Sequence, residues 1–282
     1  MKKNITIVVA MIIFCIAVAA QSDVLSGPVS MVEEWVYETE VRFGEIVETW
    51  GSHSTKKYDL GGNVVEKAQY SSSGTLIERA VHSYDSNFCK TESVYYTGSG
   101  AIDKRIKRQF DSTGREIQIE IYDGNGRLTS RTLEEYEGNL KIMRAYEADG
   151  TLSLAVDEES DSLGNTVRWV AYDKDTGNVS SVIRFTHTSD GKTLSSLMYN
   201  EDEELIGEIR YSYSYGEGGM DEITTSVFYV AGILYDSTTT GTVVEADSFE
   251  NWAEIREYTQ EERFGQSEWV LSSIKRRSIT YR

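Results

Sequence analysis

The stretch FDSTGREIQIEIYDGNGRLTSRTLEEY, residues 110–136, decides the fold of this 282-residue chain. It holds two copies of one unit: an aromatic residue, a glycine four positions on, and then about eight residues rich in Ile, Val, Thr and Tyr, a usual strand length. Asp, Asn and Gly favour tight turns, where glycine takes a positive φ at little cost. Ile117, Ile119 and Ile121 then alternate with polar residues, which indicates a half-buried strand. One unit is therefore one turn and one strand.

The aromatic residue of the unit returns through the middle of the chain at alternating intervals. It stands at positions 58, 70, 84, 96, 110, 122, 136 and 146, so that the intervals are 12, 14, 12, 14, 12, 14 and 10. A period this regular is typical of repeat proteins. We interpret the alternation as an antiparallel meander of 26-residue hairpins. Two turn types, one of them two residues longer, would then lie on opposite edges of the sheet.

The chain divides into four regions with no Pro/Gly/Ser-rich linker between them. Residues 1–20 begin with Lys2 and Lys3, continue as an apolar run and end in small residues, which predicts a cleaved signal peptide. A retained membrane anchor is the alternative. Residues 21–57 are expected to form strands that cap the array, and residues 58–205 the hairpin repeats. Residues 206–282 are expected to form longer strands and a cap of the same domain.

Composition limits the classes of function. The net charge is −18, and removal of the two leader lysines makes it −20. A surface this acidic repels phosphate backbones, which excludes nucleic acid as a partner. Cys89 is the single cysteine after residue 20, so the exported chain has no internal disulfide. Pro28 is the single proline, which suits a long series of hydrogen-bonded strands.

The fold class that follows is all-β. We expect an antiparallel meander of short hairpin repeats that forms a large curved or rolled sheet of about fourteen to sixteen strands, since open sheets of that size curl or close.

The repeat units resemble the YD repeats of RHS-type proteins of bacterial surfaces and secretions. The matching stretches are YDLGGNV (58–64), YSSSGTL (70–76), FDSTGRE (110–116), YDGNGRL (122–128) and YEADGTL (146–152). The resemblance covers residues 58–205 and implies a sheet that winds into a curved or spiralling shell. The spacing here is tighter, and the self-cleaving segment and toxin cargo of full RHS proteins have no counterpart, so encapsulation is not implied.

Two shorter resemblances lie nearby. YEGN (136–139) is similar to MORN repeats, which are also hairpin arrays, and DSFENW (247–252) is similar to a D-x-x-G-N-W element of small exported bacterial repeat proteins, with Glu250 in place of the glycine.

The residues that carry chemistry do not converge in the sequence. His53, His82 and His187 lie far apart without the paired spacing of a zinc site. No G-x-S-x-G nucleophile elbow is present, and 46 acidic residues single out no catalytic pair. We therefore predict no catalytic residue and no cofactor.

Calcium and sugar binding are the remaining possibilities at the level of sequence. DKDTGN (173–178) places Asp173 and Asp175 as in the first half of a calcium loop, and DEESD (157–161) and NEDEE (200–204) are acidic turns, so the sequence leaves open whether these residues bind a metal ion. Trp169, Trp252 and Trp269 fall outside the repeat position of the aromatic residue and are candidates for a ligand-binding face.

The function predicted from these observations is that of a noncatalytic exported binding or structural protein of a bacterial cell envelope. It would be periplasmic or at the cell surface, engage an envelope protein or glycan, and meet the membrane only through its cleaved signal peptide. An outer-membrane β-barrel is one alternative. KRIKRQ (104–109) opposes it by placing charges on both faces of a strand, as does the polar end at Tyr281 and Arg282. An envelope glycan-active enzyme is the other alternative.

Overall fold

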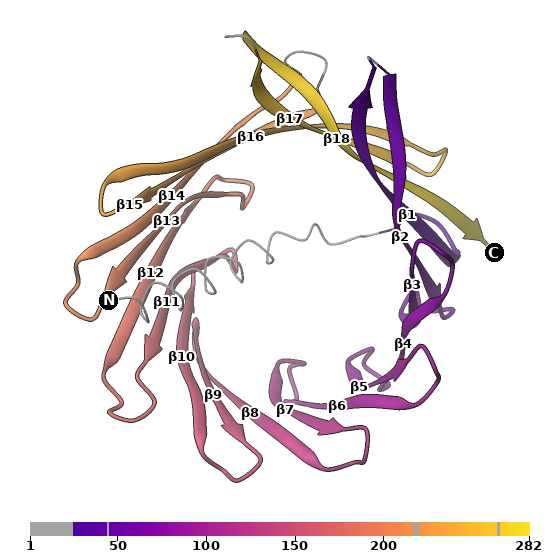
Figure 1. Ribbon diagram of the computed structural model, residues 1–282. Helices are drawn as coiled ribbons and strands as arrows, with labels where there is room; N and C mark the ends of the chain where they lie inside the picture. Colours follow the sequence, from indigo (N-terminus) through magenta and orange to yellow (C-terminus); the bar gives the residue numbers. More distant parts are fainter. Residues whose placement is uncertain (1–24, 44, 217–219, 264–265) are drawn as a thin grey trace.

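The computed structural model describes residues 25–43, 45–216, 220–263 and 266–282. The expected signal peptide (1–20) lies outside these residues. The described chain forms eighteen β-strands arranged as a ring (Figure 1). The strands are β1 (Val29–Arg42), β2 (Glu45–Tyr58), β3 (Val64–Tyr70), β4 (Leu76–Tyr84), β5 (Lys90–Thr97), β6 (Ile102–Phe110), β7 (Glu116–Asp123), β8 (Leu128–Glu137), β9 (Leu140–Glu147), β10 (Leu152–Ser160), β11 (Thr166–Tyr172), β12 (Val179–His187), β13 (Thr193–Asn200), β14 (Leu205–Ser214), β15 (Glu222–Val230), β16 (Ile233–Ala246), β17 (Trp252–Arg263) and β18 (Gln266–Tyr281).

The sheet closes on itself. Each strand pairs antiparallel with the next, and β18 pairs with β1 through a register that includes Val32 opposite Ile279 and Tyr37 opposite Ile274. The antiparallel meander is confirmed. The expected large curved or rolled sheet is here a closed barrel, and the expected number of fourteen to sixteen strands is wrong, because the barrel has eighteen. Closure pairs the backbone groups that two open edges would leave without partners.

The turns follow the chemistry that the sequence indicates. In the turn between β7 and β8, the Gly126 N–H donates to the Asp123 carbonyl at 3.0 Å and the Asp123 N–H donates to the Arg127 carbonyl at 2.9 Å. The Asp123 carboxylate accepts the N–H groups of Asn125 and Arg127. Gly126 has φ +80°. Where a turn lacks glycine, another residue takes this left-handed conformation at the same place: Phe88, Glu203 and Glu250, with φ of 63°, 61° and 64°.

The alternating interval comes from the strands and not from the turns, which corrects the expectation of two turn types. The connections 58–64, 70–76 and 84–90 each place five residues between two strands. In contrast, β3 has seven residues, whereas β4 and β6 have nine. A gain of two residues per hairpin displaces the sheet by about 3.3 Å per strand across a strand spacing of about 4.8 Å. The strands therefore tilt by about 35°, within the range of closed barrels.

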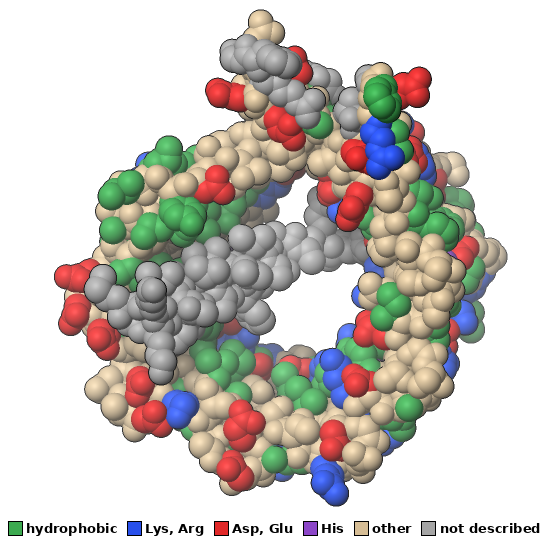
Figure 2. Space-filling view, viewed as in Figure 1, with side chains coloured by type: hydrophobic (Ala, Val, Ile, Leu, Met, Phe, Trp, Pro, Cys, Tyr) green, Lys and Arg blue, Asp and Glu red, His purple; other side chains and the backbone are tan. Residues whose placement is uncertain are grey.

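The dimensions of the barrel follow from this tilt. Eighteen strands at that spacing and tilt give a backbone diameter of about 34 Å. A barrel this wide leaves an open lumen, which Figure 2 shows, instead of a packed core.

Register partners share a face of the sheet, so two sets of side chains run around the barrel. One set contains Lys67, Ala80, Tyr95 and Lys104, each opposite the next. Lys67 and Lys104 are exposed, but Arg277 and Arg108 on the same face are only 2 % and 18 % exposed. Crowding of this kind marks the concave side, so this set lines the lumen.

The second set of side chains forms the outer wall. It contains Ala68, Arg79 and Tyr96, which are opposite one another in register. Arginines of this set stand further out in solvent: Arg131 is 46 % exposed and Arg210 is 60 % exposed. Divergence of neighbouring side chains on a convex surface explains the difference.

Candidate functional site: the two walls of the barrel

The outer wall carries a repeated contact between three strands. Arg79 on β4 binds the Glu66 carboxylate on β3, with its Nε 2.8 Å from Oε2. The guanidinium also lies 5.5 Å from the ring centre of Tyr96 on β5. The ion pair and the cation–π contact therefore join a hairpin to the next strand. Tyr96 is the aromatic residue of its repeat unit, so the periodic tyrosine has a defined structural use.

The same arrangement recurs around the barrel, and we call it the outer belt. Register places Arg105 opposite Tyr122 and Arg131 opposite Tyr146, as Arg79 stands opposite Tyr96. The acid–cation–aromatic sets with all contacts present are Glu66–Arg79–Tyr96, Asp157–Arg144–Tyr172, Glu208–Arg210–Tyr229 and Glu254–Arg276–Tyr37.

The lumen wall is also charged, and five of its positive groups lie in one arc over β2 to β6. The arc consists of Lys56, Lys67, Lys90, Lys104 and Arg108, and we call it the basic arc. Lys56 stands directly opposite Lys67 in register. Like charges opposite each other destabilise a sheet. In a chain of net charge −18, this concentration of cations is a local departure from the rest of the molecule.

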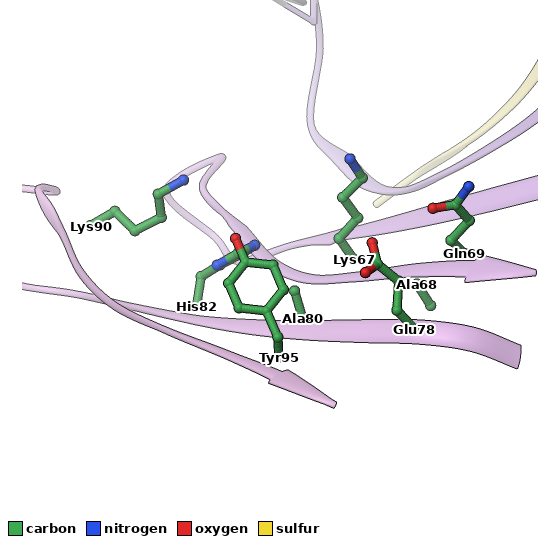
Figure 3. A pocket seen from close by; sticks show the side chains of 8 residues that line it. All are labelled: Lys67, Ala68, Gln69, Glu78, Ala80, His82, Lys90 and Tyr95. Atoms are coloured by element: carbon green, nitrogen blue, oxygen red, sulfur yellow. The ribbon is translucent and has the colours of Figure 1, made fainter. Parts of the chain in front are cut away.

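A hollow of ≈ 200 Å³ lies in the basic arc. Its lining comes from three adjacent strands, β3, β4 and β5, and the side chains of Lys67, His82 and Tyr95 rise from the sheet toward one side (Figure 3). The lining residues are Lys67, Ala68, Gln69, Glu78, Ala80, His82, Lys90 and Tyr95. Lys90 and Glu78 lie at opposite ends of this group, with His82 and Tyr95 between them (Figure 3).

His82 sits at the floor of the hollow. Its Nδ1 lies 2.9 Å from the hydroxyl of Ser93, which is fully buried and also accepts a bond from Arg108 at 3.3 Å. Burial, followed by the charges of Lys90, Arg108 and Lys67, lowers the pKa of His82 to about 4. Burial and the nearby Arg108 also lower the pKa of Lys90. Both shifts report positive charge held together away from water.

Acidic groups limit the arc on the side of β7 and β8. Arg108 Nε lies 3.1 Å from Glu116 Oε2. Burial raises the pKa of Glu116, and the charge of nearby Glu134 acts in the same direction. Glu134 accepts a bond from the Tyr136 hydroxyl at 2.8 Å. Beyond Arg108 the lumen wall therefore changes from basic to acidic.

The three histidines remain apart in the structure. His53 lies on the outer wall between the rings of Trp35 and Tyr70, at centroid distances of 5.1 Å to each. His187 lies at the end of β12 beside Phe185. Among the described residues, no group of three or more His, Cys, Asp or Glu side chains is placed to hold a metal ion.

The candidate tryptophans do not form one ligand-binding face. Trp169 belongs to the lumenal set through Ile183, its register partner. Trp252 stacks against the guanidinium of Arg277 at 3.5 Å. Trp269 lies over the backbone of Gly241, where an added Cβ would meet its ring at 3.3 Å. The three rings are therefore separate structural contacts.

The acidic turns are engaged in contacts of their own. Asp173 accepts bonds from the Asp175 and Thr176 N–H groups and from the Thr176 hydroxyl, and Asp175 pairs with Lys174. In DEESD, Asp157 pairs with Arg144, and in NEDEE the turn is closed by Asn200. These carboxylates stabilise turns and strands.

The sequence reasoning missed the basic arc. Its members are separated by four to twenty-three positions along the chain and come from four strands that only strand pairing brings together. The signal that could have found them is strand parity, because Lys56, Lys67 and Lys104 share one face once register is known.

Comparisons with known proteins give structural likenesses only. No family model and no curated protein matches the chain. A porin-like protein from Bacteroides uniformis shares 10 % identity over 90 % of this chain and 98 % of its own, with a TM-score of 0.36. A porin-like protein from Bacteroides vulgatus shares 11 % identity over 90 % of this chain and 98 % of its own, with a TM-score of 0.27. TcdB2-TccC3-TEV gives 11 % over 83 % of this chain and 16 % of its own, with a TM-score of 0.21.

At TM-scores this low, these likenesses define neither the family nor the function. Membership of the YD repeat family has no support from a family model, whereas the all-β, repeat-like architecture is present in the structure itself. Closure into an eighteen-stranded barrel fits the outer-membrane alternative better than the open binding sheet that the sequence suggested. No helix within the described residues is long and apolar enough to cross a membrane.

Proposed function

We propose that this chain is a noncatalytic, exported hollow barrel of a bacterial cell envelope, with water on both walls and a lumen that admits solutes. The observation that carries the proposal is the charge on the outer belt. Arg79, Arg144 and Arg210 lie on the outer wall within strands, paired to acids of the same wall. Neither wall is apolar, since the lumen side carries the basic arc.

Magnitudes decide between water and lipid around the barrel. An outward Arg or Lys at the bilayer midplane costs about 2–4 kcal/mol, and a lipid-facing barrel needs an apolar band about 25 Å tall. Six cations of the outer belt at that cost would add up to about 12–24 kcal/mol, which is as large as or larger than the 5–15 kcal/mol by which proteins are usually stable. Ion pairing reduces this cost but leaves the acids to be desolvated as well.

The outer-membrane barrel is the second candidate, and closure favours it. Antiparallel meanders with an even number of strands are the architecture of bacterial outer-membrane proteins, and wide ones hold aqueous channels. For this candidate to hold, the outer belt would have to lie outside the hydrocarbon region.

Extraction of the expressed protein separates the two candidates. The first predicts that the processed chain, produced with its own leader, is released in soluble and folded form without detergent, and that it leaves liposomes impermeable. Recovery only in the detergent-soluble membrane fraction, with channel activity in liposomes, would establish the second candidate and reject the first. A far-ultraviolet spectrum dominated by β-structure confirms folding in either case.

An absence of catalysis stays a prediction. Turnover of an envelope glycan that is lost on replacement of acids on one wall would contradict it.

A further inference from the structure

Two lysines of the basic arc, Lys67 and Lys90, have no counter-ion among the described residues. Among the described residues, Lys57, Lys141, Lys174, Lys192 and Lys275 each pair with an acid within 2.8 Å. The side chains of Lys67 and Lys90 form neither an ion pair nor a hydrogen bond within the part of the chain that the structure describes. The chain has 46 acidic and 28 basic residues, so a shortage of acidic partners does not explain why these lysines are unpaired. No carboxylate of the described chain therefore balances the charge of these two side chains.

Further positive groups surround the two lysines. Lys56 stands opposite Lys67, and Arg108 reaches Ser93 beneath His82. The pKa values of His82 and Lys90 are both lowered in part by their cationic neighbours. Repulsion of this kind lowers the stability of the empty barrel. A bound anion would reduce it, because a negative charge between the lysines offsets their mutual repulsion.

The hollow provides the geometry of a site. Lys67 and Lys90 enter it from β3 and β5, with His82 and Tyr95 between them (Figure 3). Gln69 adds a neutral amide to the lining. Glu78 is the single carboxylate of the lining and lies away from Lys90 (Figure 3). Glu78 lies beside Lys67 in Figure 3, so its carboxylate disfavours an anion at that end and favours one over His82 and Tyr95, on the side of Lys90. A volume of ≈ 200 Å³ suits a small solute.

We propose that this hollow binds the oxyanion of a small solute, a phosphoryl or carboxylate group held between Lys67 and Lys90 on the lumen wall. Small anionic solutes are then the class that the lumen takes. This rests on the proposed function, because the site can be reached only if the lumen is open to solutes. Tyr95 and Gln69 contact the part of the solute to which the oxyanion group is attached.

Calorimetric titration of the purified, folded protein tests the site. The probes are inorganic phosphate, glucuronate and, as the neutral control, glucose. At least one of the two anions should bind with 1:1 stoichiometry, and glucose should not. Phosphate alone or glucuronate alone would assign the source of the oxyanion. Absence of binding by both anions to the folded barrel overturns the proposal, while leaving the solubility test of the barrel unaffected.

Variants locate the binding. Lys67→Gln and Lys90→Gln should each weaken anion binding about tenfold, the usual effect of losing one charge-assisted hydrogen bond. Lys107→Gln is the matched control, because Lys107 lies on the outer wall over the ring of Tyr122. It should change binding by less than about twofold, since an exposed charge on the far side of the sheet is screened. An equal loss in Lys107→Gln would show non-specific counter-ion binding and reject the site.

Two further readouts separate binding from a structural role. Lys67→Gln should raise the melting temperature of the ligand-free protein while it weakens binding, because it relieves repulsion from Lys56. Saturation with phosphate should raise the pKa of His82 measured by NMR, since a nearby negative charge favours the imidazolium. An unchanged His82 pKa in the saturated protein would place the anion elsewhere.

Discussion

Arg79 binds the carboxylate of Glu66 on the preceding strand through two of its nitrogen atoms. This pair is one example of the outer belt. In the belt, adjacent strands are linked by side-chain contacts in addition to their backbone hydrogen bonds. Because Arg79 is 43 % exposed, the bond lies in a region where water and salt weaken Coulomb attraction.

A double-mutant cycle on Glu66→Ala and Arg79→Ala should give a coupling free energy of about 0.5–1 kcal/mol, as for exposed ion pairs with good geometry. Denaturant unfolding in low and high salt measures it, and the coupling should decrease in salt. The pair Lys174–Asp175, on an exposed turn, is the control and should couple more weakly. A salt-independent coupling above about 3 kcal/mol would indicate a dehydrated outer wall and contradict the proposed exposure to water.

The free energy of unfolding of the barrel should decrease as pH is lowered, over a pH range set by His82. Its folded pKa is about 4, below the unfolded value of 6.5, because burial and nearby cations disfavour the imidazolium. Between these values the unfolded chain binds a proton that the folded chain refuses, so the free energy of unfolding decreases as pH falls from 6.5 toward 4. Above 6.5 both states are neutral at His82, and the effect vanishes.

His82→Asn should remove this part of the pH dependence. Denaturant unfolding at pH 7.5, 6.5, 5.5 and 4.5 measures the difference between the two proteins. Parallel curves for wild type and variant would show that His82 titrates normally in the folded state. The carboxylates of the turns, such as Asp161, have lowered pKa values and lose their contribution at lower pH in both proteins.

The left-handed turn position allows a reciprocal test. Glu203→Gly should raise the free energy of unfolding by about 1 kcal/mol, because a non-glycine residue at φ 61° is strained there. Gly126→Ala should lower it by a similar amount, although its added Cβ would contact nothing within 4 Å. Urea unfolding of both variants measures the pair. Equal effects in the same direction would show that backbone strain does not govern these turns.

Deletions within a strand should depend on parity. Deletion of Thr132 alone moves Glu134, which is buried, and Tyr136 to the opposite wall, because side chains alternate along a strand. Deletion of Thr132 and Leu133 together keeps them on the lumen side. The single deletion should therefore lower the yield of soluble barrel and its melting temperature more than the double deletion. The reverse order would mean that strand length matters more here than the faces of the wall.

Much of the local structure could be predicted from the sequence, because it depends on residues close together. The turn glycines, the alternation of Ile117 to Ile121 and the hairpin meander all express short-range preferences. Closure could not be predicted, since it depends on the pairing of β1 with β18 across the whole chain. The local pattern of an open sheet and of a barrel is the same until both edges meet.

The candidate site could be predicted least. The role of a lysine here depends on the face of the strand, and one position in register exchanges lumen for outer wall. Lys67 and Lys107 are both lysines within strands and have no feature in the sequence that distinguishes them, yet the structure places them on opposite walls. The error in the turn types has the same origin: the interval of two residues was assigned to loops, whereas only register shows that it belongs to strands such as β4 and β6.

The two-residue difference between neighbouring strands makes the hairpin a unit of growth. Insertion of one further 26-residue hairpin would preserve tilt, because each hairpin carries its own displacement, and would widen the barrel by about 4 Å. Duplication of a short gene segment can thus change the bore while each wall keeps its chemistry. The number of hairpins encoded in the gene then sets the width of the lumen, provided that the first and last strands still pair in register.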